Sequence, residues 1–359
     1  MLKTIFKLSA VAAAAAALFV NVHPGFGKGP DKKERNTFRS LPNIQKGRFV
    51  NEKTSNMEMN AADLYSFLKD SLQKREERSP AGDLLLAYTD WKRENSITWF
   101  GHSTFYITIG DFKILVDPML GPAASPVSFL GSRRYTGSLL HLIEEMPEID
   151  VVLLTHDHYD HLDYPSIQKL HSKVRRFLVP LGVGAHLKRW GVEAEKITEL
   201  NWWEETKEEG ILFALTPSRH FSGRGMLNRD HTLWGGWAVL AENTRLYISG
   251  DGGYGPHFKK IGAAYGPFDL TMMEGGQYDD RWNWVHMRPE EAVQGHKDVH
   301  GRKMMLAHWG GFTLAYHSRK EPVERALKAA EAQEVELLTP AVGSTVSIHE
   351  PAPQPKWWR

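Results

Sequence analysis

A strand-like apolar run, Val151–Leu154, leads directly into a cluster made of His156, His158, Asp160 and His161. Histidine is the commonest metal ligand among side chains. Because alternate side chains of an extended segment point the same way, His156 and His158 can bind one ion together. Asp160 and His161 lie just beyond, where the chain turns, and can reach a second ion. The alternative is a histidine-rich surface loop, but the spacing and the preceding strand favour a fold that holds two cations at a strand end.

Three further residues stand at the ends of predicted strands and extend this ligand set: His220, Asp251 and His308. Each is followed by glycines or a turn, which allows the backbone to run close to a crowded site. Rigid elements hold ligands most accurately, so strand ends are suitable positions. A single strand-end histidine is more often structural. Together, and in this order after the first cluster, the three residues predict a complete site.

Nitrogen and oxygen ligands without sulfur suit zinc, and also iron or manganese. Two cations about 3.5–4 Å apart lower the pKa of a shared water and clamp the attacked and leaving oxygens. We therefore predict two zinc ions, with iron or manganese as alternatives. The predicted ligands of the first ion are His156, His158 and His220. Those of the second ion are Asp160, His161 and His308, and Asp251 is predicted to bind both ions.

The composition excludes several classes of protein. The chain has 359 residues and a formal net charge of +1, enough for one large domain with a full core. It has no basic run long enough to follow a nucleic-acid backbone, so we expect no nucleic-acid partner. Cysteine is absent, which rules out disulfides, thiolate metal sites and a cysteine nucleophile.

Residues 1–27 are predicted to be a signal peptide or a membrane anchor. Lys3 and Lys7 precede an apolar, alanine-rich run over 8–20, which is short for a membrane span. An ordinary buried helix is the alternative. We expect the protein to be exported, and so periplasmic or membrane-associated.

Residues 28–93 are predicted to form an N-terminal arm and a helix over Ala61–Arg78, before a main domain at 94–349 and a tail at 350–359. In the main domain, short apolar runs predict strands, and helical patterns fall between several of them. Two sheets sandwiched between helices are expected. The predicted strands are Ile97–Phe100, Thr104–Ile109, Phe112–Val116, Val151–Leu154, Phe177–Val179, Ile211–Leu215, Trp234–Leu240, Arg245–Ile248, Leu270–Met273, Met304–Ala307 and Val335–Leu338. The predicted helices are Ser166–Ser172, Val183–Trp190, Pro289–Val299 and Pro322–Ala332.

The His-x-His-x-Asp-His motif and the later ligands resemble the metallo-β-lactamase superfamily, whose α/β fold is a four-layer αββα sandwich. Further stretches resemble one branch of it, the N-acylphosphatidylethanolamine-hydrolysing phospholipase D-like hydrolases. These stretches are Ile97–Thr104, Leu115–Pro118, Leu233–Trp237, Gly250–Tyr254 and His286–Ala292. The resemblance implies a hydrolase domain over 94–349 that cleaves a phosphodiester by a metal-bridging hydroxide, with N-acylphosphatidylethanolamine or a related lipid as substrate.

The resemblance also implies roles for individual residues. Asp160 and Asp251 would orient the nucleophile, Asp160 would also accept its proton, and His286 would position or protonate the leaving group. Gln277 and Arg281 are candidates for contact with a phosphate, while Asp117 and His102 can orient ligands or act in simple turns. The substrate would be a small molecule or a phospholipid. Contact with a membrane surface and formation of a homodimer are both compatible with the resemblance. The alternatives are a lactonase or carboxylic-ester hydrolase with the same metals, a nuclease, and a non-enzymatic exported zinc-binding protein.

Overall fold

The computed structural model describes residues 18–53, 66, 69–70, 78–80, 83–225 and 227–359. Most of the predicted helix over Ala61–Arg78 and most of the predicted signal lie outside these residues. Among the described residues, none of the helices has the length and apolar character needed to cross a membrane.

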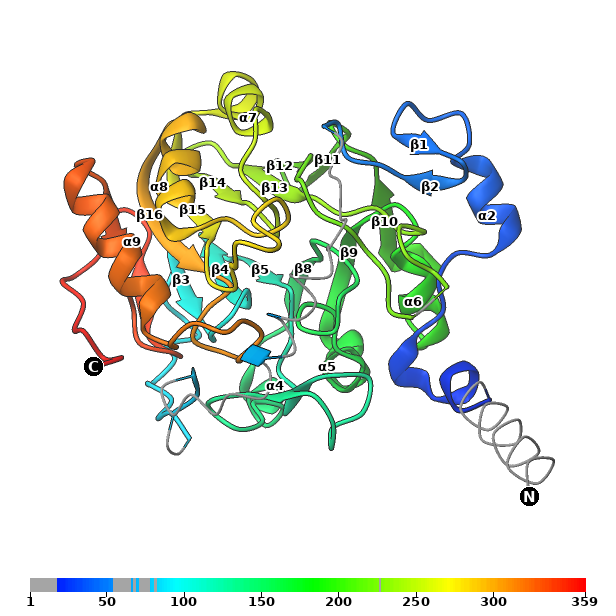
Figure 1. The fold of residues 1–359 in the computed structure, drawn as a ribbon, viewed down its shortest axis with the longest axis horizontal. Helices are drawn as coiled ribbons and strands as arrows, with labels where there is room; N and C mark the ends of the chain where they lie inside the picture. Colours follow the sequence, from blue (N-terminus) through cyan, green and yellow to red (C-terminus); the bar gives the residue numbers. More distant parts are fainter. Residues whose placement is uncertain (1–17, 54–65, 67–68, 71–77, 81–82, 226) are drawn as a thin grey trace.

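Two seven-stranded sheets form the centre of the molecule (Figure 1). The strands of the first sheet, in spatial order, are β10 (Ile197–Leu200), β9 (Val174–Pro180), β8 (Ile149–Leu153), β5 (Phe112–Val116), β4 (Phe105–Ile109), β3 (Ser96–Trp99) and β18 (Thr345–Ser347). Those of the second are β11 (Glu205–Glu208), β12 (Ile211–Thr216), β13 (Gly236–Leu240), β14 (Arg245–Ile248), β15 (Phe268–Glu274), β16 (Gly301–Ala307) and β17 (Glu336–Leu338).

The first sheet is covered on both faces, and its central strands β5 and β8 are apolar at four of their five positions for that reason. In β8, Val151 and Leu153 belong to the core between the two sheets, whereas Val152 belongs to a second core on the outer face. This split follows from the two-residue period of a strand, which sends successive side chains to opposite faces.

Helices cover the outer face of each sheet. The second core joins the first sheet to α4 (Leu142–Glu145), α5 (Tyr164–Leu170) and α6 (Gly184–Arg189). The apolar faces of α7 (His257–Tyr265), α8 (Pro289–Asp298) and α9 (Glu321–Ala332) pack on the second sheet. The predicted four-layer αββα sandwich is confirmed.

The strand directions bring the predicted ligands to one edge. Strands β5, β8, β9 and β10 are parallel neighbours, as are β14, β15, β16 and β17. Strand β12 runs in the same direction as β14, because both are antiparallel to β13. The carboxyl ends of β8, β12, β14 and β16 therefore meet where the two sheets face each other.

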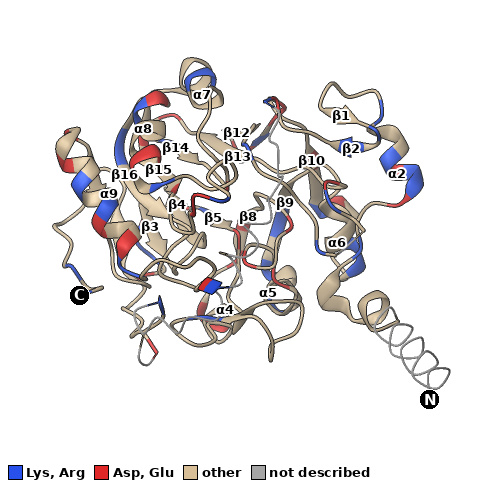
Figure 2. Ribbon diagram, in the orientation of Figure 1, with Lys and Arg blue, Asp and Glu red and all other residues tan. Residues whose placement is uncertain are grey.

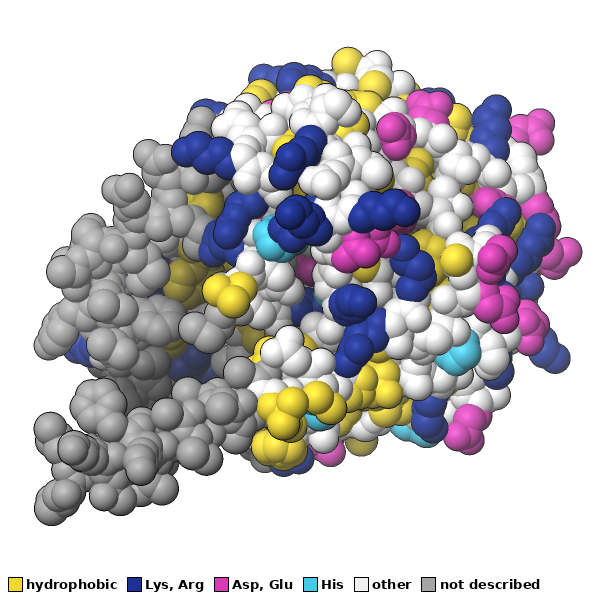
Figure 3. Space-filling view, turned by 90° about the vertical axis from the view of Figure 1, so that its right-hand side faces the viewer, with side chains coloured by type: hydrophobic (Ala, Val, Ile, Leu, Met, Phe, Trp, Pro, Cys, Tyr) yellow, Lys and Arg dark blue, Asp and Glu magenta, His cyan; other side chains and the backbone are white. Residues whose placement is uncertain are grey.

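Residues at the end of the predicted signal and in the predicted N-terminal arm pack on the domain. They include a 3-10 turn, η1 (Pro24–Phe26), then α2 (Lys32–Thr37) and a small hairpin of β1 (Ile44–Gln45) and β2 (Arg48–Phe49). Basic side chains are prominent on α2 and α6 (Figure 2), and Lys188 of α6 pairs with Glu34 of α2 at 2.8 Å. On the face that carries these elements, basic and acidic side chains are interspersed (Figure 3).

Candidate metal centre

The loop that follows β8 brings His156, His158, Asp160 and His161 to the edge where the sheets meet. His220, Asp251 and His308 arrive at the same place from the ends of β12, β14 and β16. His308 has a φ of 65°, a left-handed conformation that is costly for a residue with a side chain and is typical of functional sites. Its backbone N–H donates to the carbonyl of His102 at 3.0 Å, so the two sheets are joined directly beneath the site.

Three imidazoles converge in a first group. His158 Nδ1 lies 2.9 Å from His156 Nε2 and 3.3 Å from His220 Nε2. Burial lowers the pKa of all three rings, and for His156 and His220 it lies well below its usual range. Neutral rings carry lone pairs that face one another at these distances, and a shared cation is what such an arrangement accommodates.

A second group gathers around Asp160 Oδ2. This oxygen lies 3.5 Å from His161 Nε2, 3.1 Å from His308 Nε2 and 2.8 Å from His102 Nε2. Burial opposes charge on His161, but the carboxylates of Asp251, Asp160 and Asp117 outweigh it and raise the pKa of His161 well above its usual range. This pocket therefore attracts positive charge.

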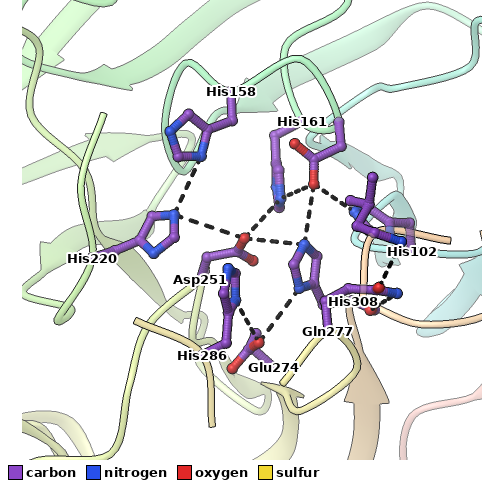
Figure 4. A network of polar contacts seen from close by, with 12 residues as sticks. His102, His158, His161, His220, Asp251, Glu274, Gln277, His286 and His308 are labelled. Carbon is purple, nitrogen blue, oxygen red and sulfur yellow. Dashed lines mark hydrogen bonds and ion pairs between the residues drawn. The ribbon is translucent and has the colours of Figure 1, made fainter. Parts of the chain in front are cut away.

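Asp251 lies between the two groups (Figure 4). Its Oδ2 atom is 3.2 Å from His161 Nε2 and 3.1 Å from His308 Nε2, and it is 3.9 Å from Nε2 of both His156 and His220. Among the described residues, His161 Nε2 and Asp251 Oδ1 are buried without a hydrogen-bond partner. Buried polar atoms in a native fold normally have partners, so these orphans fit a site built to bind cations.

Three of the rings, those of His156, His161 and His220, are oriented by a group on their far side, the usual support for a ligand histidine. His220 Nδ1 donates to the carbonyl of Val285 at 3.0 Å, and His161 Nδ1 donates to Asp117 at 2.7 Å. Thr155 Oγ1 donates to Asp117 and can thus accept from His156 Nδ1 at 3.0 Å. These contacts turn the opposite nitrogen of each ring toward the cluster.

His286 stands beside the cluster on a loop before α8. Its Nδ1 donates to Glu274 at 2.9 Å, and its ring is stacked on His308 at 5.0 Å and lies 5.1 Å from that of His220. Glu274 is also 3.4 Å from His308 Nδ1 and accepts from the Met287 N–H. The pairing with Glu274 leaves His286 Nε2 as the atom that can exchange a proton at the site.

Gln277 and Arg281 are engaged elsewhere. The Gln277 amide group, which is buried, donates to the carbonyls of His308 and Phe312 and accepts from two backbone N–H groups of the following loop. Arg281 binds Asp279 at 2.5 Å and Asp70 at 3.1 Å. Their contact with a phosphate stays a prediction.

Two residues of the site were missed at the level of the sequence. Glu274 ends β15 at the same edge as the ligands, so a strand-end carboxylate was the signal available. Asn51 belongs to the arm, far from every motif, and its side chain pairs with the backbone of His220 at 2.8 and 3.1 Å. Nothing in the sequence around Asn51 indicates this contact.

The sequence model described as Beta-lactamase superfamily domain matches residues 113–309, which include all the predicted ligands. An uncharacterized protein of Mycobacterium tuberculosis is 39% identical over 327 residues, 89% of this chain and 87% of its own length. The chain belongs to the metallo-β-lactamase superfamily.

Relatives with a named activity lie within this superfamily. N-acyl-phosphatidylethanolamine-hydrolyzing phospholipase D 1 of Caenorhabditis elegans is 37% identical over 251 residues, covering 65% of this chain and 70% of its own. The mitochondrial enzyme of the same name from Saccharomyces cerevisiae is 31% identical over 65% of this chain and 51% of its own. The superfamily membership, these relatives and the His/Asp cluster identify a metal-dependent hydrolase.

Solved structures of metal-dependent and other hydrolases share the fold. The metallo hydrolase Igni18 of Ignicoccus hospitalis superposes with a TM-score of 0.55 at 21% identity, over 70% of this chain and 97% of its own. The isothiocyanate hydrolase from Delia radicum gut bacteria gives a TM-score of 0.54 at 20% identity, over 70% and 98%.

Proposed function

We propose that the protein is a dinuclear metal-dependent phosphodiesterase of the phospholipase D type, acting on N-acylphosphatidylethanolamine or a related phospholipid. The observation that carries this proposal is that His286, a candidate general acid, lies beside the two groups of His and Asp side chains that could hold metal ions. Glu274 holds His286 in place at 2.9 Å. The activity named for the relatives in Caenorhabditis elegans and Saccharomyces cerevisiae supports the substrate class.

The proposed ligand sets follow the two groups of side chains. His156, His158 and His220 would hold one cation through Nε2, Nδ1 and Nε2. Asp160, His161 and His308 would hold the other, with Asp251 shared by both. Two such cations would activate a water and neutralise charge on the phosphate oxygens.

The protein's own groups would manage orientation and protons. Asp160, held by His102 at 2.8 Å, would orient the attacking water and accept its proton. His286 would donate a proton from Nε2 to the departing alcohol oxygen, while its Nδ1–H stays on Glu274. Glu274 is only 1% exposed, so its carboxylate is well placed to stabilise the charged ring.

Export is part of the proposal. The charged start and the apolar run before residue 21 support a signal or an anchor. Outer membrane protein RomA of Klebsiella pneumoniae is 49% identical over 94 residues, 26% of this chain and 70% of its own, which supports a location in the cell envelope.

The deciding experiment measures turnover of bis(p-nitrophenyl) phosphate and of an N-acylated phosphatidylethanolamine by the metal-loaded protein, beside a panel of lactones. Phosphodiester or lipid turnover that a chelator abolishes is expected. Lactone turnover alone would move the protein to the lactonase alternative, and no turnover of any substrate would favour a non-enzymatic metal-binding protein. His158→Ala is expected to lose one bound ion by elemental analysis; retention of two would refute its place in the ligand set.

A further inference from the structure

A cavity of about 560 Å³ lies beside the metal cluster, within the size range of small-molecule sites. The packed N-terminal arm forms one wall through Gln45, Val50 and Glu52. The domain forms the other through Phe221, Arg229 and Trp284. The cavity is therefore built from segments more than 150 residues apart in the sequence.

The arm is fixed to the metal cluster by Asn51. Its side-chain amide donates to the His220 carbonyl at 2.8 Å, and its side-chain oxygen accepts from the His220 N–H at 3.1 Å. The same oxygen accepts from Trp234 Nε1 at 3.2 Å. These three contacts hold the wall of the cavity in a defined position relative to a proposed metal ligand.

The cavity opens toward the first group of imidazoles. His220 itself lines it, and the Phe221 ring lies 4.6 Å from His158 and 4.8 Å from His220. Trp284, which also lines the cavity, lies two residues before His286, whose ring is 5.1 Å from that of His220. A group that enters the cavity is therefore close to the proton donor proposed for the leaving oxygen.

The walls favour an uncharged occupant. The rings of Phe221 and Trp284 supply apolar surface, while Phe49 and Trp234, which also line the cavity, are almost fully buried. The charged lining residues already have partners: Arg229 pairs with Asp230 at 3.5 Å and lies over the Phe221 ring, and Glu52 pairs with Lys260 at 2.7 Å. Burying a further charge among paired ions would cost free energy without a new partner.

We propose that this cavity is a substrate subsite that binds the uncharged organic group of the leaving alcohol. This inference rests on the proposed phosphodiesterase function. The arm thereby becomes part of the active site, since residues 45–52 select the alcohol whose departure His286 assists.

The first test is direct binding to the full-length, metal-loaded protein by isothermal titration. Three probes share a six-carbon chain and differ in charge: N-hexanoylethanolamine is neutral, hexanoate is an anion and hexylamine is a cation. The neutral amide alcohol is expected to bind at least 10-fold more tightly than either ion. Equal or tighter binding of a charged probe would overturn the proposal.

Two substitutions place the binding in the cavity. Val50→Trp fills it from the arm, and Trp284→Ala removes an aromatic wall from the domain side. Each is expected to weaken binding of N-hexanoylethanolamine at least 10-fold while two ions per chain are retained. Lys46→Asn changes an exposed residue of the same hairpin outside the cavity and is expected to leave binding unchanged. Unaltered binding in both cavity variants, with native circular dichroism, would overturn the proposal.

Turnover separates this inference from the function on which it rests. Phosphodiester cleavage by the wild type, with no change of KM in either cavity variant on substrates with long alcohols, would overturn the subsite alone. Cavity-dependent binding of the neutral probe without any phosphodiester cleavage would support a site for a neutral organic group in this cavity, but it would overturn the phosphodiesterase and with it the assignment of that group to a leaving alcohol.

Discussion

Asp251 presents one carboxylate oxygen to four imidazole nitrogens within 3.9 Å, which no other described carboxylate of the site does. The short loop after β14 makes this possible because Gly250 has a φ of 60° and lies against the carbonyl of Gly235. A Cβ at Gly250 would approach that oxygen to 2.4 Å. The shared ligand therefore depends on a glycine that no other residue can replace without strain.

His286→Ala tests the proposed proton donor. Both metals should remain bound, because His286 is not in the proposed ligand sets, and kcat should fall roughly 10²–10⁴-fold, the usual contribution of general acid–base catalysis. Elemental analysis and the pH profile of kcat check this. His349→Ala removes an exposed histidine away from the site and is the control. Unchanged kcat in His286→Ala would reduce His286 to a structural role.

Asn51→Ala tests whether the arm positions a ligand. The substitution removes both contacts to the His220 backbone, so affinity for one of the two ions should fall about 10–100-fold, as for other residues that orient ligands. Asn51→Asp keeps the acceptor for the His220 N–H and loses only the donor, so its metal affinity should lie between those of the wild type and Asn51→Ala. The readout is metal affinity by competition with a chelating dye. Wild-type affinity in Asn51→Ala would contradict the role.

At this scale the sequence predicts side chains that lie in the motif or at the ends of apolar strands, and it misses a side chain such as Asn51 that reaches the site from outside the predicted strands. His156, His158, Asp160 and His161 lie within six consecutive residues after β8, where His156 and His158 group with His220, and Asp160 and His161 group with His308. Asn51 reaches His220 across 169 residues, and only tertiary packing creates that contact.

Among the elements, the segment His23–Lys28, called the strap below, connects the end of α6 to Arg224, which in turn binds the loop over residues 155–162 that carries the first predicted ligands. Buried Arg224 donates to Asp157 and Leu162 carbonyls of that loop at 2.7 and 2.6 Å, and to the Gly25 carbonyl at 2.7 Å. Trp190 Nε1 donates to the Pro24 carbonyl at 2.8 Å. The strap therefore supplies acceptors that the domain's own buried donors need.

Shortened chains test the strap. A chain that begins at His23 keeps these acceptors, whereas one that begins at Lys28 leaves buried donors of Arg224 and Trp190 unpaired. An unpaired buried donor costs about 1–3 kcal/mol, so the shorter chain should unfold at lower urea concentration. Equal midpoints for the two chains would show that the strap adds no stability. If the chain that begins at Lys28 is the less stable one, any cleavage of the signal that leaves a stable protein should occur before residue 24.

Strands with strong apolar patterns were predictable and weak ones were not. Strand β11 reads Glu-Thr-Lys-Glu and lies at the edge of its sheet, so one side of it needs no apolar residues. Strand β10 and strand β18 are likewise short edge strands, and α7, with its internal glycine, was missed as well. These elements form because neighbours already in place offer hydrogen bonds and apolar surface.

For the whole molecule, buried neutral histidines outside the metal cluster make stability depend on pH. Burial lowers the pKa of His257 to about 3 and that of His296 to about 4. In the unfolded chain both would titrate near 6.5, so below that pH the unfolded state binds protons that the folded state does not. Stability should be full above pH 6.5 and fall as the pH drops toward 4.

Urea unfolding of the wild type and of His257→Leu at pH 7 and pH 5 measures this effect. The wild type should lose up to about 2 kcal/mol more than the variant between the two pH values, the linkage expected for one such group. An identical pH-dependent loss in both proteins would mean that His257 is protonated in the folded state.

Strand β18 pairs with β3 through residues 345–347, whereas the six strands that it joins come from residues 96–200. Domains generally fold as units during synthesis, beginning from the N-terminus. Here the first sheet lacks its edge strand until residue 347 has left the ribosome, although the rest of that sheet is made much earlier. The first sheet is therefore completed only after the whole second sheet, residues 205–338, has been synthesised, so its last strand joins a sandwich whose other strands already exist.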